Sequence, residues 1–313
     1  MAEARHDTRF QRWFNRKGWI NVTIATPYVW LIFFFLLPFV VVLAMSFATR
    51  TPTAPPFSFG GEYPLINTDH YARLFQDDLY IRAYLISIMN AGFATVMCLL
   101  IGYPMALGLT RVSKSWRNVL LMLVILPFWT SFLLRVYAWM GLMGTNSWFN
   151  KLLTGAYNWV VPSEWALRYI PMMNTNFAVV LVTVYSYLPF MILPLFANLE
   201  KLDRTLDEAA MDLGSRPARV FFDVTLPLSV PGIIAGSMLV FIPASGELII
   251  PSLVGSSSRP MIGRVIADEF TSARSWPMAS AVAVALLVLL VVPLMLYTYY
   301  EGKSHEKARE EGA

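Results

Sequence analysis

The sequence predicts an all-α membrane protein with six transmembrane helices, and three observations support this. The chain is 57% hydrophobic and only 14% charged, a composition typical of membrane proteins and not of soluble domains. Its apolar residues fall into six runs, each long enough to cross about 30 Å of hydrocarbon at about 1.5 Å per residue. Its Lys and Arg residues gather in the segments on one side of those runs. We therefore expect one membrane domain over residues 27–300.

The first run, at 27–48, follows a segment with five cations and three aromatic residues that share a helical face. We expect that segment, residues 1–26, to be an amphipathic helix on an anionic leaflet. The run itself is too long for the core of a typical signal peptide, which favours a retained span. The remaining spans are expected at 83–109, 118–141, 177–199, 228–254 and 277–300, followed by a tail at 301–313.

The distribution of Lys and Arg orients these spans. Six spans place both termini on one side, and the segments of that side carry fifteen Lys and Arg residues. The longer segments of the other side carry eight. Because short cytoplasmic segments are enriched in Lys and Arg, we expect both termini and the loop at 200–227 to be cytoplasmic. The outer loop at 142–176 holds Trp148, Trp159 and Trp165, which suit either interfacial anchoring or docking of a soluble binding protein.

The most informative stretch lies in the 200–227 loop. Residues 208–213 are good helix formers, and Gly214 suits the left-handed position that ends a helix. Ser215 can then cap a second short helix, with Arg216 and Pro217 in its first turn. We therefore predict a helix, a sharp bend and a second helix, a shape suited to docking on another protein.

The order Glu-Ala-Ala, three residues, Gly, nine residues, an aliphatic residue, one residue, Leu-Pro resembles the cytoplasmic coupling loop of ATP-binding-cassette importer permeases. Val224 stands where isoleucine is usual, the one departure. The alternative is an ordinary solvated loop whose charges keep it out of the bilayer. The resemblance implies that a separate ATPase contacts the residues of this motif: Glu208, Ala209, Ala210, Asp212, Gly214, Arg216, Leu226 and Pro227.

Chemistry-bearing motifs are otherwise missing from the sequence. Gly302-Lys303-Ser304 imitates the end of a phosphate-binding loop, but Tyr297 stands where that loop needs glycine. The single cysteine, Cys98, lies in an apolar run, and the three histidines lie outside the spans. We therefore expect a non-enzymatic subunit with no cofactor of its own, whose ATP and Mg²⁺ are bound by a partner.

Two charged residues lie inside predicted spans, and such residues usually face protein or a water-filled cavity. Arg135 comes about 17 residues into the third span and Glu247 about 19 into the fifth, so both should lie in the outer half of the bilayer. Glu247 stands between Pro243, Gly246 and Pro251, which interrupt a helix. It is expected either to face the pathway or to pair with Arg135, which could also snorkel to the surface.

Further stretches resemble the permeases of spermidine/putrescine importers: residues 126–132 continuing through Arg135 to 137–139, residues 187–194 leading to 199–203, and residues 242–244 with 246–247 and 250–251. The resemblance covers most of 27–300. It implies a bacterial inner-membrane complex of two permeases that differ in sequence, two ATPases and a periplasmic binding protein, with alternating access as its mechanism. Aromatic residues near Glu247 could make cation–π contacts with a polyamine. The expected pathway residues are thus Glu247, Trp129, Tyr185, Tyr187 and Arg135.

Other functions stay open on the sequence alone. Permeases for amino-acid-like compounds, iron or oxyanions share several of these stretches. A secondary transporter would need its own ion or proton site in the membrane, for which only two charged residues are available, and no inverted repeat is visible. An intramembrane enzyme would need a catalytic constellation that the sequence lacks.

Overall fold

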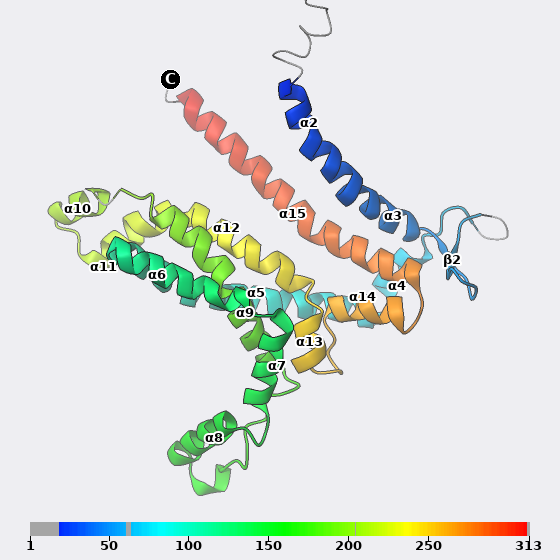
Figure 1. The fold of residues 1–313 in the computed structure, drawn as a ribbon, viewed down its shortest axis with the longest axis horizontal. Coiled ribbons are helices and arrows are strands. Elements are labelled where there is room, and N and C mark those ends of the chain that lie inside the picture. Colours follow the sequence, from blue (N-terminus) through cyan, green and yellow to red (C-terminus); the bar gives the residue numbers. More distant parts are fainter. Residues whose placement is uncertain (1–18, 61–63, 204, 312–313) are drawn as a thin grey trace, which may run out of the picture. The chain divides into compact units, whose positions relative to one another are not determined.

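The computed structural model describes residues 19–60, 64–203 and 205–311, although side chains are not described at every position within them. The predicted amphipathic segment therefore lies mostly outside the described residues. The chain divides into two compact units, residues 1–73 with 269–289, and residues 74–268 with 290–313. Figure 1 shows that helices build both units, and the only described strands form one short hairpin.

The first unit begins with one continuous apolar helical segment and a small hairpin. Its elements are α2 (Trp19–Leu31), η2 (Ile32–Leu36), α3 (Leu37–Met45), β1 (Thr49–Arg50), β2 (Phe57–Ser58) and the start of α4 (Asp69–Gln76). Arg50 donates to the Ala273 carbonyl at 2.6 Å, and the Phe57 and Phe270 rings pack on Trp276. These contacts tie the hairpin to the first turn of α15 (Trp276–Glu311).

The second unit is a helical bundle centred on α5, α9 and α12 (Figure 1). Its elements are α5 (Asp78–Arg111), α6 (Lys114–Ile125), η3 (Leu126–Trp129), α7 (Phe132–Met143), α8 (Trp148–Val160), η4 (Ser163–Trp165), α9 (Asn176–Leu199), α10 (Thr205–Asp212), α11 (Pro217–Val220), η5 (Phe221–Thr225), α12 (Leu226–Ser245), α13 (Ile249–Val254) and α14 (Ile262–Thr271) as far as Asp268, with the later part of α15.

Glycine lets the three central helices approach closely. A Cβ added at Gly236 of α12 would lie 2.8 Å from the Met191 sulfur and 3.0 Å from the Met191 carbonyl oxygen of α9. A Cβ added at Gly102 of α5 would lie 3.1 Å from the same Met191 side chain. Met191 is fully buried between the two glycines. Small residues at helix contacts are a common basis of packing in membranes, where lipid offers no hydrophobic drive for helices to associate.

Polar side chains add specific links to this core. The Tyr103 hydroxyl of α5 and the Ser229 hydroxyl of α12 lie 2.9 Å apart, and both side chains are buried. Cys98 is a free, fully buried thiol in the same core, as expected for a small hydrophobic residue.

Four described helical segments are long and apolar enough to cross a membrane: Thr23–Met45, Asp78–Arg111, Asn176–Leu199 and Pro217–Ser245. The predicted third span is bent by 90° between Lys114–Trp129 and Phe132–Met143. Proline explains the position of the bend, because Pro127 lies at the start of the 3₁₀ turn η3 and the backbone leaves the helical region at Thr130 and Ser131. The sixth predicted span has a shorter described apolar stretch, Trp276–Val292.

The predicted fifth span is helical only to Ser245, where α12 ends. Residues 246–248 then break the helix before α13 begins. The break is at Gly246, whereas Pro243 and Pro251 lie inside the two helices. The interruption around Glu247 is thus confirmed, with glycine and not proline at its centre.

We predict that Gly236→Val destabilises the protein, because the added side chain would overlap both the sulfur and the backbone of Met191. Overpacking of this kind typically costs about 1–3 kcal/mol. The measurement is thermal unfolding of the purified protein in detergent. Gly108→Val, on the open side of α5, is the matched control, since no atom lies within 4 Å of its added Cβ. Equal unfolding temperatures for the two variants would contradict the close packing.

Candidate coupling segment and membrane-embedded polar site

The segment after α9 forms the predicted helix and bend. α10 ends with Asp212, and Gly214 has φ of +85°, in the left-handed region that favours glycine. The Ser215 N–H donates to the Ala210 carbonyl at 3.1 Å, and the Gly214 N–H donates to the Met211 carbonyl at 2.9 Å. This pair of bonds is the Schellman arrangement, which satisfies the last carbonyls of a helix. The sharp bend after α10 is therefore confirmed.

The start of the second helix differs from the prediction. α11 begins at Pro217, and its N-cap is Arg216, which has an extended backbone and makes no side-chain cap. The residue before a proline is pushed away from the helical region, so Arg216 cannot join the first turn and Ser215 is displaced from the cap position. In addition, α11 is not a separate short helix. It continues through η5 into α12 as one helical segment, Pro217–Ser245.

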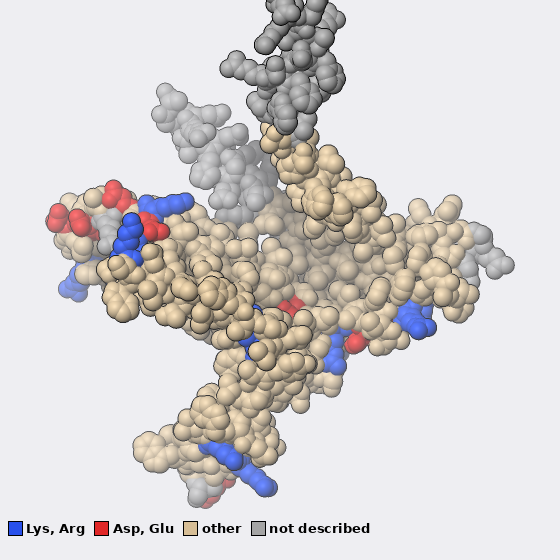
Figure 2. All heavy atoms as spheres, in the orientation of Figure 1, with Lys and Arg blue, Asp and Glu red and all other residues tan. Residues whose placement is uncertain are grey.

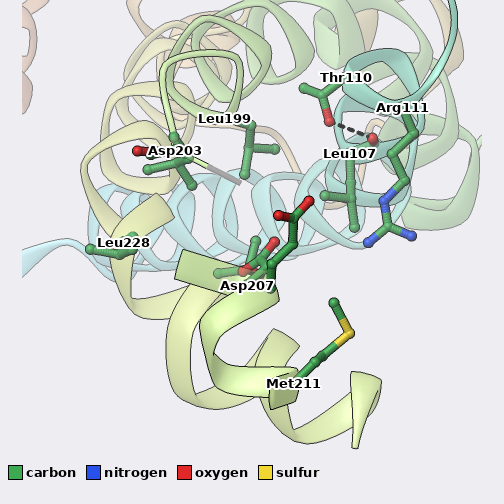
Figure 3. Close-up of a pocket in the computed structure, with 11 residues that line it drawn as sticks. Leu107, Thr110, Arg111, Leu199, Asp203, Asp207, Met211 and Leu228 are labelled. Carbon is green, nitrogen blue, oxygen red and sulfur yellow. Dashed lines mark hydrogen bonds between the residues drawn. The ribbon is translucent and has the colours of Figure 1, made fainter. Parts of the chain in front are cut away.

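A pocket of about 250 Å³ lies between α10 and the ends of the neighbouring helices. Figure 3 shows Asp207 of α10 and Arg111 of α5 among the side chains around it. Its charged lining residues are Asp203, Asp207, Glu208 and Arg111, so the pocket carries an excess of negative charge. The charged side chains of this end of the second unit stand out in Figure 2 against a mostly uncharged surface.

Hydrogen bonds hold the walls of this pocket. The Thr225 hydroxyl donates to Asp207 at 3.2 Å, which ties α10 to the helix that follows it. The Thr205 N–H donates to Asp203 at 3.0 Å, and this bond holds the pKa of Asp203 below its ordinary value. Asp203 is therefore ionised at neutral pH. Glu208 is exposed and makes no ion pair with any described residue. It lies in the first turn of α10, where the helix dipole stabilises an acidic side chain.

The other residues of the predicted coupling motif lie at the surface or near it. Ala209, Asp212, Gly214, Arg216 and Pro227 are exposed, while Ala210 and Leu226 are half-buried. Leu213, at the bend, is 88% exposed. The bend at Leu213 and Gly214, called the tip of the segment, is thus exposed, whereas the start of the segment is held by hydrogen bonds.

Arg117 joins three helix ends at the base of the segment. Its guanidinium contacts Glu200, the C-cap of α9, at 2.6 Å, and donates to the Thr110 carbonyl in the last turn of α5 at 3.4 Å. Arg117 itself is in the first turn of α6, and its side chain is only 20% exposed. Because Arg117 is mostly buried and Glu200 is 45% exposed, water screens this bridge less than it screens a fully exposed pair, which contributes little to stability. The sequence analysis missed this arginine because its partner is 83 residues away.

The second polar site surrounds Glu247 at the break between α12 and α13. The Tyr187 hydroxyl of α9 donates to Glu247 Oε2 at 2.5 Å. Glu247 Oε1 accepts from the N–H groups of Ile249 and Ile250, at 3.0 and 3.5 Å, at the start of α13. The carboxylate therefore satisfies backbone groups that the helix break leaves free.

The α14 helix supports this break from outside. A Cβ added at Gly263 would lie 2.5 Å from the Gly246 carbonyl oxygen and 2.6 Å from that of Glu247, so only glycine permits this approach. The buried Ser87 hydroxyl of α5 accepts from the Ile262 N–H at 2.7 Å and anchors the start of α14. No local sequence pattern marks Ser87 or Gly263 as important, because both contact segments that are distant in the sequence.

A row of aromatic rings leads from Tyr187 towards Arg135. The Tyr187 and Phe190 centroids lie 5.9 Å apart, and those of Phe190 and Phe128 lie 5.0 Å apart. The Arg135 guanidinium lies 5.3 Å from the Phe128 ring and 5.6 Å from the Phe132 ring. No ion pair joins Arg135 to Glu247 among the described residues, and the Arg135 Nε and Nη1 atoms are buried without hydrogen-bond partners.

The remaining predicted pathway residues are placed differently. The Tyr185 ring packs edge-to-face on Trp139 at 5.5 Å, so it joins a second aromatic pair on α7 and α9. Trp129, at the end of η3, is 71% exposed and makes no ring contact within the described part of the chain. The structure thus brings Glu247 and Tyr187 into direct contact and connects Arg135 to them only through the aromatic row.

Comparison with known proteins agrees with this architecture. The chain is 41% identical over 282 residues to the spermidine/putrescine transport system permease protein PotB of Haemophilus influenzae, covering 90% of this chain and 93% of that protein. It is 36% identical over 274 residues to the protein of that name from Escherichia coli, covering 88% and 94%. The fold resembles a chain of a bacterial ATP-binding-cassette transporter that imports the acidic polysaccharide alginate, with TM-score 0.71, 16% identity and coverage of 95% and 99%.

Residues 98–304 match the family described as the binding-protein-dependent transport system inner membrane component. This match covers more than half of the chain, and the relatives are transport permeases and not enzymes, as the sequence analysis expected. The chain therefore belongs to the family of binding-protein-dependent transport system inner membrane components and is a permease subunit of an ATP-binding-cassette importer.

Proposed function

We propose that the imported substrate is a polyamine such as spermidine or putrescine. The observation that carries this proposal is the similarity, over nine-tenths of the chain, to a permease named for those substrates. The chemistry around Glu247 supports it, since an acidic side chain beside a row of aromatic rings suits an extended cation. Arg135 keeps its positive charge when it is stacked on Phe128 and Phe132, so the proposal places the amines of the substrate at Glu247, on the other side of the aromatic row.

In the proposed complex, this chain pairs with a second permease of different sequence, two ATPase subunits and a soluble binding protein. We assign this chain six spans, with both termini and the coupling segment in the cytoplasm, and take the bent helix pair, Lys114–Trp129 with Phe132–Met143, as the third span. The excess negative charge of the α10 pocket favours a basic side chain of the ATPase as its occupant, with Glu208 at the contact. Closure of the ATPases would then move the segment together with the helices that hold it.

The substrate is tested by ligand-stimulated ATPase activity of the complex reconstituted in lipid with its binding protein. The panel contains spermidine, putrescine, neutral and acidic amino acids, and oxyanions. We expect stimulation by the polyamines alone. Stimulation by an amino acid or an oxyanion, with none by polyamines, would replace the proposed substrate and leave the importer assignment intact.

We predict that Glu208→Lys weakens binding of the ATPase subunit by about ten-fold or more. Charge-assisted hydrogen bonds are worth about 1.5–3 kcal/mol, whereas the effect of Glu208 on its own helix is only about 0.3–1 kcal/mol. The measurement is co-purification of the ATPase with the permease pair at increasing salt. Asp223→Lys, an equal charge change in the same loop, is the control, because Asp223 lies outside the pocket and is not among the residues expected at the ATPase contact. Equal losses in both variants would show a general charge effect and no specific contact.

We predict that Gly214→Val uncouples transport from ATP hydrolysis while membrane insertion survives. Valine is strongly disfavoured at φ of +85°, so the Schellman bonds would be lost and the chain would leave α10 in a different direction. Uptake into cells is measured alongside the amount of protein in the membrane. Gly214→Asn should retain most of the uptake, because asparagine tolerates the left-handed region. Normal uptake in the valine variant would mean that the bend is unimportant for coupling.

We predict that Glu247→Gln lowers the apparent affinity for polyamine by about ten-fold, the equivalent of about 1.4 kcal/mol, and leaves unfolding nearly unchanged. Tyr187→Phe, which keeps the carboxylate charge and removes one hydrogen bond, should have a smaller effect on affinity. Uptake kinetics and thermal unfolding are measured for these variants and for Arg135→Gln. A structural Glu247–Arg135 pair is the competing explanation, and it predicts that both single glutamine variants unfold easily while the double variant recovers stability and uptake.

A further inference from the structure

A long groove runs along α5 and α9 on the second unit. Its first part, about 640 Å³, lies at the Asp78 end of α5 and is lined there by Asp78, Arg82, Asn90, Asn176, Ser258 and Arg259, among others. Its second part, about 720 Å³, continues along the two helices past Phe93, Val96, Ile101, Phe177, Val180 and Val184. Both parts share Met89, Asn90 and Asn176, so we treat them as one feature, the α5–α9 groove.

The two parts differ in chemistry. The second part is almost entirely apolar, which makes it unsuitable as a path for a cationic solute. The first part carries two arginines. Arg82 is paired with Asp78 at 3.1 Å, but both side chains are more than 70% exposed, so this pair is readily exchanged. Arg259 is exposed and has no ion-pair partner among the residues that the structure describes.

Two amides lie where the polar part meets the apolar part. The Asn90 side chain is half-buried on α5, and the Asn176 side chain is exposed at the start of α9. Neither side chain makes a hydrogen bond within the described part of the chain. An unpaired amide facing hydrocarbon is costly, and Asn90 lies inside the predicted second span, so it needs a partner that the described chain does not supply. Asn176 lies at the outer end of the predicted fourth span, at the level of the lipid headgroups and ester groups.

The dimensions match one leaflet of a bilayer. From Asn90 to Ile101 the α5 helix rises by about 16 Å at about 1.5 Å per residue, close to half of a hydrocarbon core of about 30 Å. The arginines lie beyond Asn90 towards the end of α5, opposite the end that adjoins the coupling segment. The groove is therefore ordered as a phospholipid is, with charge, then polar groups, then hydrocarbon.

We propose that the α5–α9 groove binds an anionic phospholipid. Arg82 and Arg259 contact the phosphate and headgroup, Asn90 and Asn176 donate to the ester carbonyls, and an acyl chain lies along the apolar part. Net positive charge at the head end favours an anionic over a zwitterionic headgroup, since the lining charges are two arginines against one aspartate. The second permease is the competing occupant, but an apolar helix surface would leave both amides and Arg259 without partners.

The test is native mass spectrometry of the assembled transporter from nanodiscs with equal phosphatidylglycerol and phosphatidylcholine. We expect retained phosphatidylglycerol in the wild-type complex. Gly92→Leu should displace it, because Gly92 lines the apolar part and no atom lies within 4 Å of its added Cβ. Gly108→Leu, on the same helix with equal free space and outside the groove, should retain it.

The headgroup site is tested by Arg82→Gln and Arg259→Gln, with the exposed Arg168→Gln as control. Each groove variant should reduce retention of phosphatidylglycerol relative to phosphatidylcholine by roughly five-fold, the equivalent of about 1 kcal/mol for each arginine near an anionic lipid. Equal retention of the two lipids in the wild type would overturn the proposal. The proposal would also be overturned if the Gly92→Leu chain no longer bound the second permease but still retained phosphatidylglycerol. The groove would then be a contact between the two permeases and not a lipid site. Neither result bears on which solute is imported.

Discussion

Close approach of three helices at Met191 is the constraint on which the second unit depends. The Met191 side chain of α9 lies between Gly102 of α5 and Gly236 of α12, at distances that a larger residue at either glycine would disturb. In a bilayer, such contacts supply much of the packing energy, because lipid chains and apolar side chains are nearly equivalent surroundings. With α5, α9 and α12 held in this way, the ends of the same helices define both the coupling segment and the site around Glu247.

At one end of this core, the coupling segment is held at several points and exposed at its tip. Arg117 joins the last turns of α5 and α9 to α6, and the Thr225 hydroxyl ties α10 to the helix that continues as α12. The Schellman bonds at Gly214 satisfy the end of α10 without help from neighbouring elements. The structure thus ties the segment to the ends of several helices of the central bundle, which is the geometry that the proposed coupling requires.

Towards the other end, two helices are broken, and side chains beside each break accept from or donate to the freed backbone groups. Pro127 lies in the turn at which the third predicted span bends, and the Thr130 hydroxyl donates to the Pro127 carbonyl at 2.7 Å. The break at Gly246 is satisfied through Glu247, whose other oxygen accepts from Tyr187. Such irregular backbone is tolerated at membrane depth only beside protein or a water-filled cavity. The ionisable side chains of the predicted spans therefore occur at or near the breaks.

The sequence by itself determined the membrane class, the approximate positions of most apolar helices, the bend at Gly214 and the interruption near Glu247. These features follow from composition, from the length of apolar runs and from the conformational preference of glycine, all of which are local properties. Only the tertiary structure decided that Glu247 contacts Tyr187 and α13, that Arg135 stacks on Phe128 and Phe132, and that Arg117 reaches Glu200. The start of the second helix at Pro217 and the bend near Pro127 are instead local effects of proline that the sequence analysis did not use. The physical reason is that a side chain's partner depends on how distant helices pack, and at Met191 that packing is controlled by glycines whose neighbours no local pattern reveals.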